Sequence, residues 1–116
     1  MKRYSDIELL KEPFRSIMKA FIKRTKEESL EFGVFETLRS DVRQAMLFRD
    51  GSSKAKHSKH QDGLACDLVH FKGNRWSWKD INEYKKLGKL SKEFPELEWG
   101  GNWRMRDYCH FQLKKG

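Results

Sequence analysis

Residues 58–71 of this chain have the sequence SKHQDGLACDLVHF. The first six residues are polar or glycine and predict a loop, in which Gly63 permits a turn. Residues 64–71 are mostly apolar and predict a strand. His60 and Asp67 lie too far apart along the chain to share a site on one helix face. We therefore expect one of them on the loop and the other on the strand.

A second block, residues 107–112 with the sequence DYCHFQ, supplies another histidine, His110, and a carboxylate, Asp107. Two imidazoles with the Asp67 carboxylate would leave a fourth zinc position free for water, which is typical of hydrolytic rather than structural zinc sites. Asp107 lies near the second histidine and could take the proton of that water. The two blocks predict a zinc hydrolase, and a metallopeptidase is the leading hypothesis. The alternative is that these are ordinary surface residues grouped by chance.

The remaining histidines and both cysteines are not expected to bind the metal. On strands, Cys66 and Cys109 would point away from the neighbouring ligands and into the core as reduced thiols, although they could also be extra zinc ligands. His70 is an odd number of positions from Asp67 and should face the other way. His57 is interpreted as a loop histidine, although it could take the place of His60.

Composition predicts one folded domain over residues 1–116. The chain is 37% hydrophobic, carries four Trp and eight Phe, and is too short for a second module. No apolar run approaches the roughly 20 residues that span a bilayer, so membrane insertion is not expected. The first residues lack the apolar segment of a signal peptide, which predicts synthesis in the cytoplasm. We also expect a monomer.

The net charge of +8 makes a polyanionic partner plausible. Candidates are nucleic acid, an anionic cell wall or a membrane surface, whereas the simplest interpretation is solvated basic faces. The chain has neither a recognition-helix signature nor a zinc-finger pair, so nucleic acid is not expected.

Hydrophobic spacing predicts an α+β fold, because helices and strands mix without a regular βαβ repeat. Ser5 is expected to cap a short turn through Leu10, and Gly88 to weaken a long helix. One helix, starting at Ser40 and ending at Gly51, should turn its apolar residues inward. These are Val42, Ala45, Met46 and either Phe48 or Leu47. The full set of expected helices is 5–10, 13–22, 40–50 and 77–94, and the expected strands are 30–38, 64–71, 97–99 and 108–113.

The two blocks, together with ETLR at residues 36–39 and WGGNW at residues 99–103, resemble the zinc D-Ala-D-Ala carboxypeptidase and L-alanyl-D-glutamate endopeptidase family, which includes phage endolysins. The resemblance spans residues 35–112. It implies a small antiparallel sheet flanked by helices, like that of Hedgehog and the DD-peptidases. It also implies zinc bound by His60, Asp67 and His110.

Within this resemblance Asp107 matches the catalytic base and Arg39 the residue that stabilises substrate or transition-state charge. Arg39 could alternatively be a simple salt-bridge former. Ser58 could hydrogen-bond substrate or shape the ligand loop. Trp103 could line the peptide groove, as could Trp99, for which core packing is equally plausible. Asn102 stands where relatives often carry Asp, so a charge at that position is in doubt.

The implied function is hydrolysis of the peptide stem of bacterial peptidoglycan, between L-Ala and D-Glu, by a phage endolysin released through a holin. A D-Ala-D-Ala carboxypeptidase with the same centre is the nearest alternative. A noncatalytic, zinc-containing basic binding module is the alternative from another class.

Overall fold

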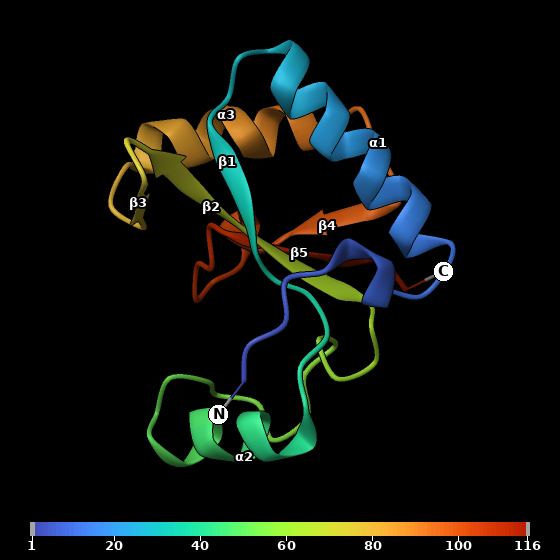
Figure 1. Cartoon of the computed structure of the whole chain (residues 1–116), viewed down its shortest axis with the longest axis vertical. Coiled ribbons are helices and arrows are strands. Elements are labelled where there is room, and N and C mark those ends of the chain that lie inside the picture. Colours follow the sequence, from blue (N-terminus) through green and yellow to red (C-terminus); the bar gives the residue numbers. More distant parts are fainter. Residues whose placement is uncertain (1, 116) are drawn as a thin grey trace.

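The structure is a computed structural model that describes residues 2–115. Figure 1 shows a sheet with helices gathered mainly on one side, and one helix set apart. No helix in this part of the chain is long and apolar enough to cross a membrane. The elements are η1 (Ile7–Leu9), α1 (Phe14–Glu27), β1 (Phe32–Glu36), α2 (Asp41–Arg49), β2 (Ala65–Lys72), β3 (Arg75–Ser77), α3 (Ile81–Ser91), β4 (Leu97–Trp99), η2 (Gly100–Asn102) and β5 (His110–Leu113).

The sheet is antiparallel and follows the order β1-β2-β5-β4, with β3 paired to the C-terminal end of β2. The register between β2 and β5 places Asp67 directly opposite His110. Directly opposed residues point to the same face, so two of the predicted ligands are brought together by strand pairing alone. The α+β fold with a small antiparallel sheet is confirmed.

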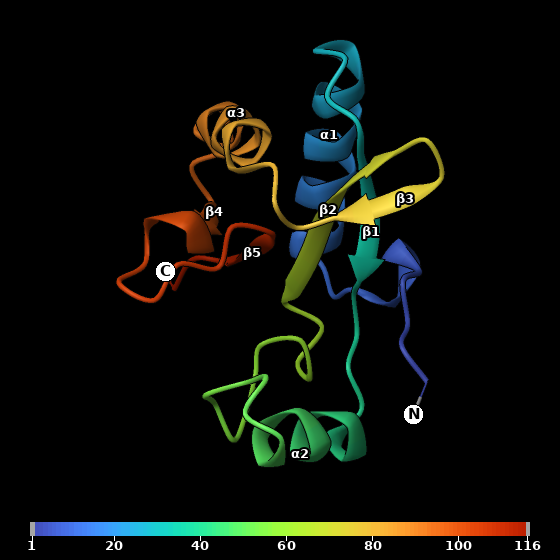
Figure 2. The ribbon, with the colours of Figure 1, turned by 90° about the vertical axis from the view of Figure 1, so that its left-hand side faces the viewer.

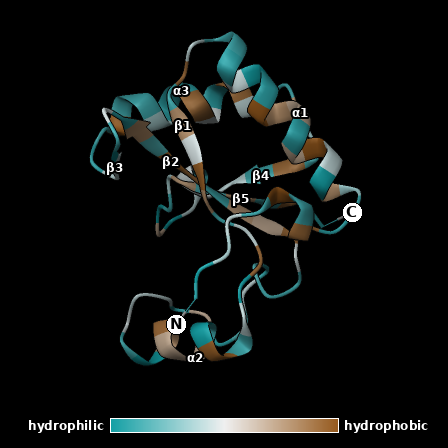
Figure 3. Cartoon of the chain, viewed as in Figure 1, coloured by the Kyte–Doolittle hydropathy of each residue, from teal (hydrophilic) through white to brown (hydrophobic). Residues whose placement is uncertain are grey.

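Helices α1 and α3 cover one face of the sheet and form the core with it. Apolar side chains of both helices meet the side chains of β2, β4 and β5 that alternate toward them, and Figure 3 shows the apolar stripes along these elements. The buried members of this cluster are Leu10, Phe14, Met18, Phe21, Cys66, Leu68, Leu87, Leu90, Leu97 and Phe111. The opposite face of β2 and β5 carries Asp67 and His110, so the core holds the strands while the other face remains for chemistry.

Helix α2 lies apart from this core, as Figure 2 shows. Ser40 caps it as expected, accepting a hydrogen bond from the backbone N–H of Arg43. The prediction that its apolar residues face inward is wrong, because Gln44 is the buried residue and Val42, Met46 and Phe48 are exposed. Gln44 faces inward, where its amide donates to Ser53 Oγ and to the carbonyl of Ala55.

Two further local predictions are corrected by the structure. Asp6, rather than Ser5, caps the first short helix by accepting a hydrogen bond from the N–H of Glu8. Ser77 does not begin a helix but ends β3, which forms a hairpin with β2, and α3 begins at Ile81. Gly73 and Asn74 both have positive φ, as a two-residue hairpin turn requires.

Gly88 has a packing role in α3, which could not be predicted from its low helix propensity. A Cβ at this position would lie 2.5 Å from Cη2 of the Trp99 indole and closer still to Cε3 and Cζ3. The missing side chain therefore allows the helix backbone to lie against the ring of Trp99, on β4. The Trp99 indole N–H donates to the carbonyl of Tyr108, which fixes the ring in this position.

We expect Gly88→Ala to destabilise the protein by about 1–3 kcal/mol, because overpacking against Trp99 outweighs the gain in helix propensity. Thermal and denaturant unfolding would measure the change. Lys85→Ala, at an exposed position of the same helix, serves as the control and should leave stability nearly unchanged. A Gly88→Ala variant as stable as the wild type would contradict this account of α3 packing.

Candidate metal centre

His60, Asp67 and His110 converge on one point of the sheet face that lies opposite the core. Their candidate ligand atoms all lie within 4.8 Å of one another. Asp67 Oδ1 is 3.2 Å from His60 Nε2 and 3.2 Å from His110 Nδ1. Two ligands at roughly 2.0–2.1 Å from a tetrahedral zinc would be about 3.3 Å apart. The donor set and its spacing therefore fit a zinc ion.

The loop before β2 holds His60 in a defined orientation. Its Nδ1 donates to the carbonyl of Thr37 at 2.7 Å, which leaves Nε2 unprotonated toward the centre. The carbonyl of His60 accepts from the backbone N–H of Arg39, and its N–H donates to Ser58 Oγ. Ser58 thus shapes the ligand loop, one of the two roles considered for it. The ring of His60 is buried.

His110 is oriented from the opposite side by a chain of hydrogen bonds. Its Nε2 donates to Gln112 Oε1 at 2.9 Å, so that Nδ1 faces the centre. The Gln112 amide in turn donates to Glu98 Oε1 at 3.4 Å. The other oxygen of Glu98 accepts from the Trp103 indole N–H at 2.7 Å, and the Trp103 ring lies 5.1 Å from the His110 ring. Glu98 therefore supports both the ligand and the aromatic ring beside it.

The charges within the cluster favour an ionised carboxylate. Burial alone would raise the pKa of Asp67, but the neighbouring imidazoles of His60 and His110 hold it far below its ordinary value. Burial lowers the pKa of His110, whereas its hydrogen bond to Asp67 raises it, and the net effect is upward. A cation is therefore favoured between these groups, whether it is a proton or a metal ion.

Asp107 lies at the rim of the cluster. Its Oδ2 is 4.0 Å from His110 Nδ1, and 48% of the side chain is exposed. Partial burial and the negative charge of Asp67 both raise the pKa of this carboxyl. Cys109 Sγ donates a hydrogen bond to Asp107 Oδ1 at 3.4 Å. An accessible carboxyl at this distance can reach a water or an amine beside the ligands.

The two cysteines differ in their surroundings. Cys66 is fully buried in the core cluster, as strand alternation predicted. Cys109 is not on the described strand and is only partly buried, so the expectation that it points into the core is wrong; the chain turns at Tyr108 and Cys109 just before β5 begins. Burial raises the pKa of both thiols, which favours their protonated form near neutral pH.

Arg39 forms the salt bridge considered for it and also lies beside Asp67. Its guanidinium donates to Glu36 at 2.7 Å and to Gln44 at 2.8 Å, while the same nitrogen that reaches Glu36 lies 3.9 Å from Asp67 Oδ2. Burial raises the pKa of Glu36, but hydrogen bonds from Arg39 and Arg43 outweigh it and lower the pKa. Within the part of the chain described, Arg39 Nε has no hydrogen-bond partner although it is buried. The residue is thus anchored by a salt bridge and also borders the centre.

His57 and His70 lie outside the cluster. His57 contacts Asp62 at 2.9 Å on the exposed loop. His70 points to the core face, where its Nδ1 contacts Asp80 at 2.7 Å.

Several supporting residues were not singled out in the sequence. Gln112 could have been found, because it lies two positions after His110 and so points to the same face of the strand. Thr37 acts through a backbone carbonyl, and Glu98 and Gln44 act through contacts between distant segments. No local sequence pattern predicts these roles.

Comparison with known proteins places the chain in a family. Residues 51–113 match the family described as D-alanyl-D-alanine carboxypeptidase. The L-alanyl-D-glutamate peptidase of Listeria phage A118 is 30% identical over 88 residues, which cover 68% of this chain but only 28% of the phage protein.

Solved structures show the same fold over nearly the whole chain. The L-Ala D-Glu endopeptidase ChiX of Serratia marcescens has a TM-score of 0.78 and 27% identity, with 97% of this chain and 90% of that chain covered. The LD-carboxypeptidase LdcB shares the fold, with a TM-score of 0.64 and 17% identity over 90% of this chain and 58% of that chain. The chain therefore belongs to the D-alanyl-D-alanine carboxypeptidase family of peptidases, as the two metal-ligand blocks indicated.

Proposed function

We propose that this protein is a zinc-dependent endopeptidase that hydrolyses the L-Ala–D-Glu bond in the peptide stem of bacterial peptidoglycan. The observation that carries the proposal is the convergence of His60, Asp67 and His110, with Asp107 at the rim, on a fold that matches ChiX from end to end. The phage relative, which is named for the same bond, supports the choice of substrate.

The three ligand residues are suited to zinc by donor type, spacing and orientation. In each imidazole one nitrogen donates to Thr37 or Gln112, so the other nitrogen faces the centre. Zinc in a site with three protein ligands supplies Lewis acidity that makes water reactive near neutral pH.

The residues around the ligands have separate roles in the reaction. Asp107 accepts the proton of the attacking water and returns it to the departing amine, for which a half-exposed carboxyl with a raised pKa is suitable. Arg39 stabilises the negative charge that develops on the scissile carbonyl, because its guanidinium borders Asp67. Trp103, beside His110, forms a wall for the bound peptide, and Ser58 keeps the His60 loop in place.

In its biological setting the protein would act as a phage endolysin. It would be made in the cytoplasm, reach the wall through a holin and act there as a single-domain monomer. The positive net charge supports attraction to acidic wall polymers.

A D-Ala-D-Ala carboxypeptidase is the second candidate, favoured by the description of the matching family. Mass spectrometry of defined muropeptides after incubation with zinc-loaded protein separates the two. A new D-Glu amino terminus would establish the endopeptidase, whereas released D-alanine would refute it in favour of the carboxypeptidase. Folded, zinc-loaded protein that cleaves neither bond would favour a noncatalytic binding module.

We expect Asp107→Asn to keep its zinc and lose activity by about 10²–10⁴-fold, because an amide cannot accept the proton. Muropeptide cleavage rates and metal content would be measured on the same preparation. Asp62→Asn, whose side chain is 43% exposed, is the matched control and should retain full activity. Loss of zinc along with activity would instead identify Asp107 as a ligand.

His60→Ala should lose stoichiometric zinc, because a ligand is removed from the centre. His57→Ala, three positions earlier and exposed, should keep it. Metal analysis of the purified proteins by mass spectrometry gives the comparison. The reverse result would show that the ligand in this loop is His57.

Glu98→Ala should weaken zinc binding by about 10–100-fold, since residues that orient a ligand typically have effects of this size. The loss is expected because Gln112 and Trp103 both depend on the Glu98 carboxylate. Competition with a zinc chelator measures the affinity, with the exposed neighbour Glu96→Ala as control. Equal affinity in both variants would leave Glu98 without a role at the centre.

A further inference from the structure

Four aromatic rings gather outside the hydrophobic core, at the end of the sheet formed by β1, β2 and β3. Phe71 packs on Trp76 with ring centroids 4.7 Å apart, and Phe35 lies 5.2 Å from Trp76 and 5.1 Å from Trp78. Trp78 is 50% exposed and Phe71 is 37% exposed. Clustered exposed aromatic rings are unusual on a protein surface and typically mark an interaction site. We call these four residues the aromatic surface.

The aromatic surface lies on the same face of the sheet as the candidate metal centre. Along β2, Asp67, Val69 and Phe71 alternate to one face while Cys66 and Leu68 point into the core. Trp76 is the cross-strand partner of Phe71, which carries the face onto β3. Phe71 lies four positions after Asp67 on the strand, or about 13 Å at about 3.3 Å per residue. A ligand crossing the centre could therefore continue onto the aromatic rings.

Local backbone features hold the aromatic surface in place. A Cβ on Gly33 would lie 2.9 Å from Cη2 of Trp76, so the glycine makes room for the indole across β1. The turn at Gly73 and Asn74, both at positive φ, returns the chain so that Trp76 faces Phe71. These contacts hold the inner rings in place and leave Trp78 at the outside.

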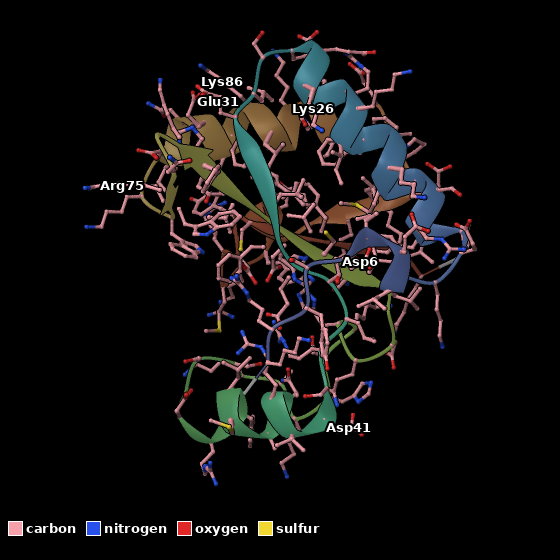
Figure 4. All side chains as sticks on the ribbon, viewed as in Figure 1. Asp6, Lys26, Glu31, Asp41, Arg75 and Lys86 are labelled. Atoms are coloured by element: carbon pink, nitrogen blue, oxygen red, sulfur yellow. The ribbon has the colours of Figure 1, made fainter. Side chains whose placement is uncertain are left out.

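Basic residues border the aromatic surface. The guanidinium of Arg3 lies 3.7 Å from the ring centroid of Phe35. Lys72, Arg75 and Lys79 are exposed around the hairpin, and Figure 4 shows Arg75 extending outward from this end of the molecule. Of these, Lys72 also contacts Glu31 at 3.5 Å. The border therefore combines apolar ring surface with positive charge.

We propose that the aromatic surface binds sugar rings of the peptidoglycan glycan strand, while its basic border contacts carboxylates of neighbouring stem peptides. The proposal rests on the proposed function. Pyranose rings present apolar C–H faces that stack on aromatic side chains, and a stem peptide carries free carboxylates. In an L-Ala–D-Glu substrate, only the alanine and a lactyl group separate the scissile bond from the nearest sugar. That extended span is about 7 Å, which brings the glycan within reach of rings about 13 Å from Asp67.

Binding to glycan strands stripped of their peptides tests the proposal without requiring cleavage. Zinc-loaded wild type, Trp78→Ala and Trp78→Tyr would be compared by isothermal titration calorimetry with the soluble stripped strands. We expect Trp78→Ala to bind roughly tenfold more weakly, as loss of one stacked ring implies, and Trp78→Tyr to recover most of the affinity. Phe48→Ala is the matched control, because Phe48 is an exposed aromatic residue on α2, away from this surface.

Arg75→Ala separates charge from stacking. It should weaken binding to intact sacculi and leave binding to uncharged N-acetylglucosamine oligomers unchanged, because only the sacculi carry carboxylates. On sacculi, Trp78→Ala should raise KM with little change in kcat, and on a sugar-free stem peptide it should match the wild type.

Trp78→Ala that binds stripped strands as tightly as the wild type would overturn the proposal. The proposal would also be overturned if Trp78→Ala lost binding to a single-stranded oligonucleotide but not to glycan strands, since bases also stack on aromatic rings beside positive charge. Glycan binding without cleavage of any stem peptide would refute the proposed function but not the proposed role of the aromatic surface. Cleavage by a protein that does not bind glycan would refute the surface alone.

Discussion

The antiparallel pairing of β2 with β5 is the constraint on which the rest of the structure depends. It opposes Asp67 to His110 and at the same time points Cys66 and Phe111 into the core, so one register serves both chemistry and stability. A slip of β5 by one residue would turn His110 toward the core and Phe111 away from it. The apolar packing of α1 and α3 against this sheet is therefore also what keeps two ligands together.

Polar contacts hold the third candidate ligand, His60, at the centre. His60 is held by the carbonyl of Thr37 and the N–H of Arg39, and Arg39 is held by Glu36 and Gln44. Glu36 is almost fully buried, and a buried charge without its partner is costly, by about 3–5 kcal/mol when such a pair is broken. The precision of the centre on this side thus comes from a hydrogen-bonded network, and on the other side from Gln112 and Glu98.

Much of the fold and of the site could be predicted from the sequence because the decisive signals are local. The candidate ligands lie in two short blocks, and the strand carrying Asp67 is an apolar run with a clear beginning. The inward face of α2 could not be predicted, because hydrophobic spacing does not identify a helix that turns a glutamine toward polar partners. The hairpin at β3 was missed because three residues are too few for a pattern, and Ser77 followed by Asp80 imitates a helix start. Glu98 acts through tertiary contacts that no spacing announces.

Because α2 is attached by polar contacts, the two sides of the centre also differ in the free energy that local opening requires. Elements with little buried apolar surface open locally at a smaller cost than the core, and α2 with its following loop is such an element. An ion held jointly by His60 from that loop and by the strand ligands Asp67 and His110 would join a weakly anchored segment to the most stable part of the fold. Part of its binding free energy would then serve as local folding free energy. Metal occupancy and the order of the α2 segment would accordingly rise and fall together, as one thermodynamic quantity.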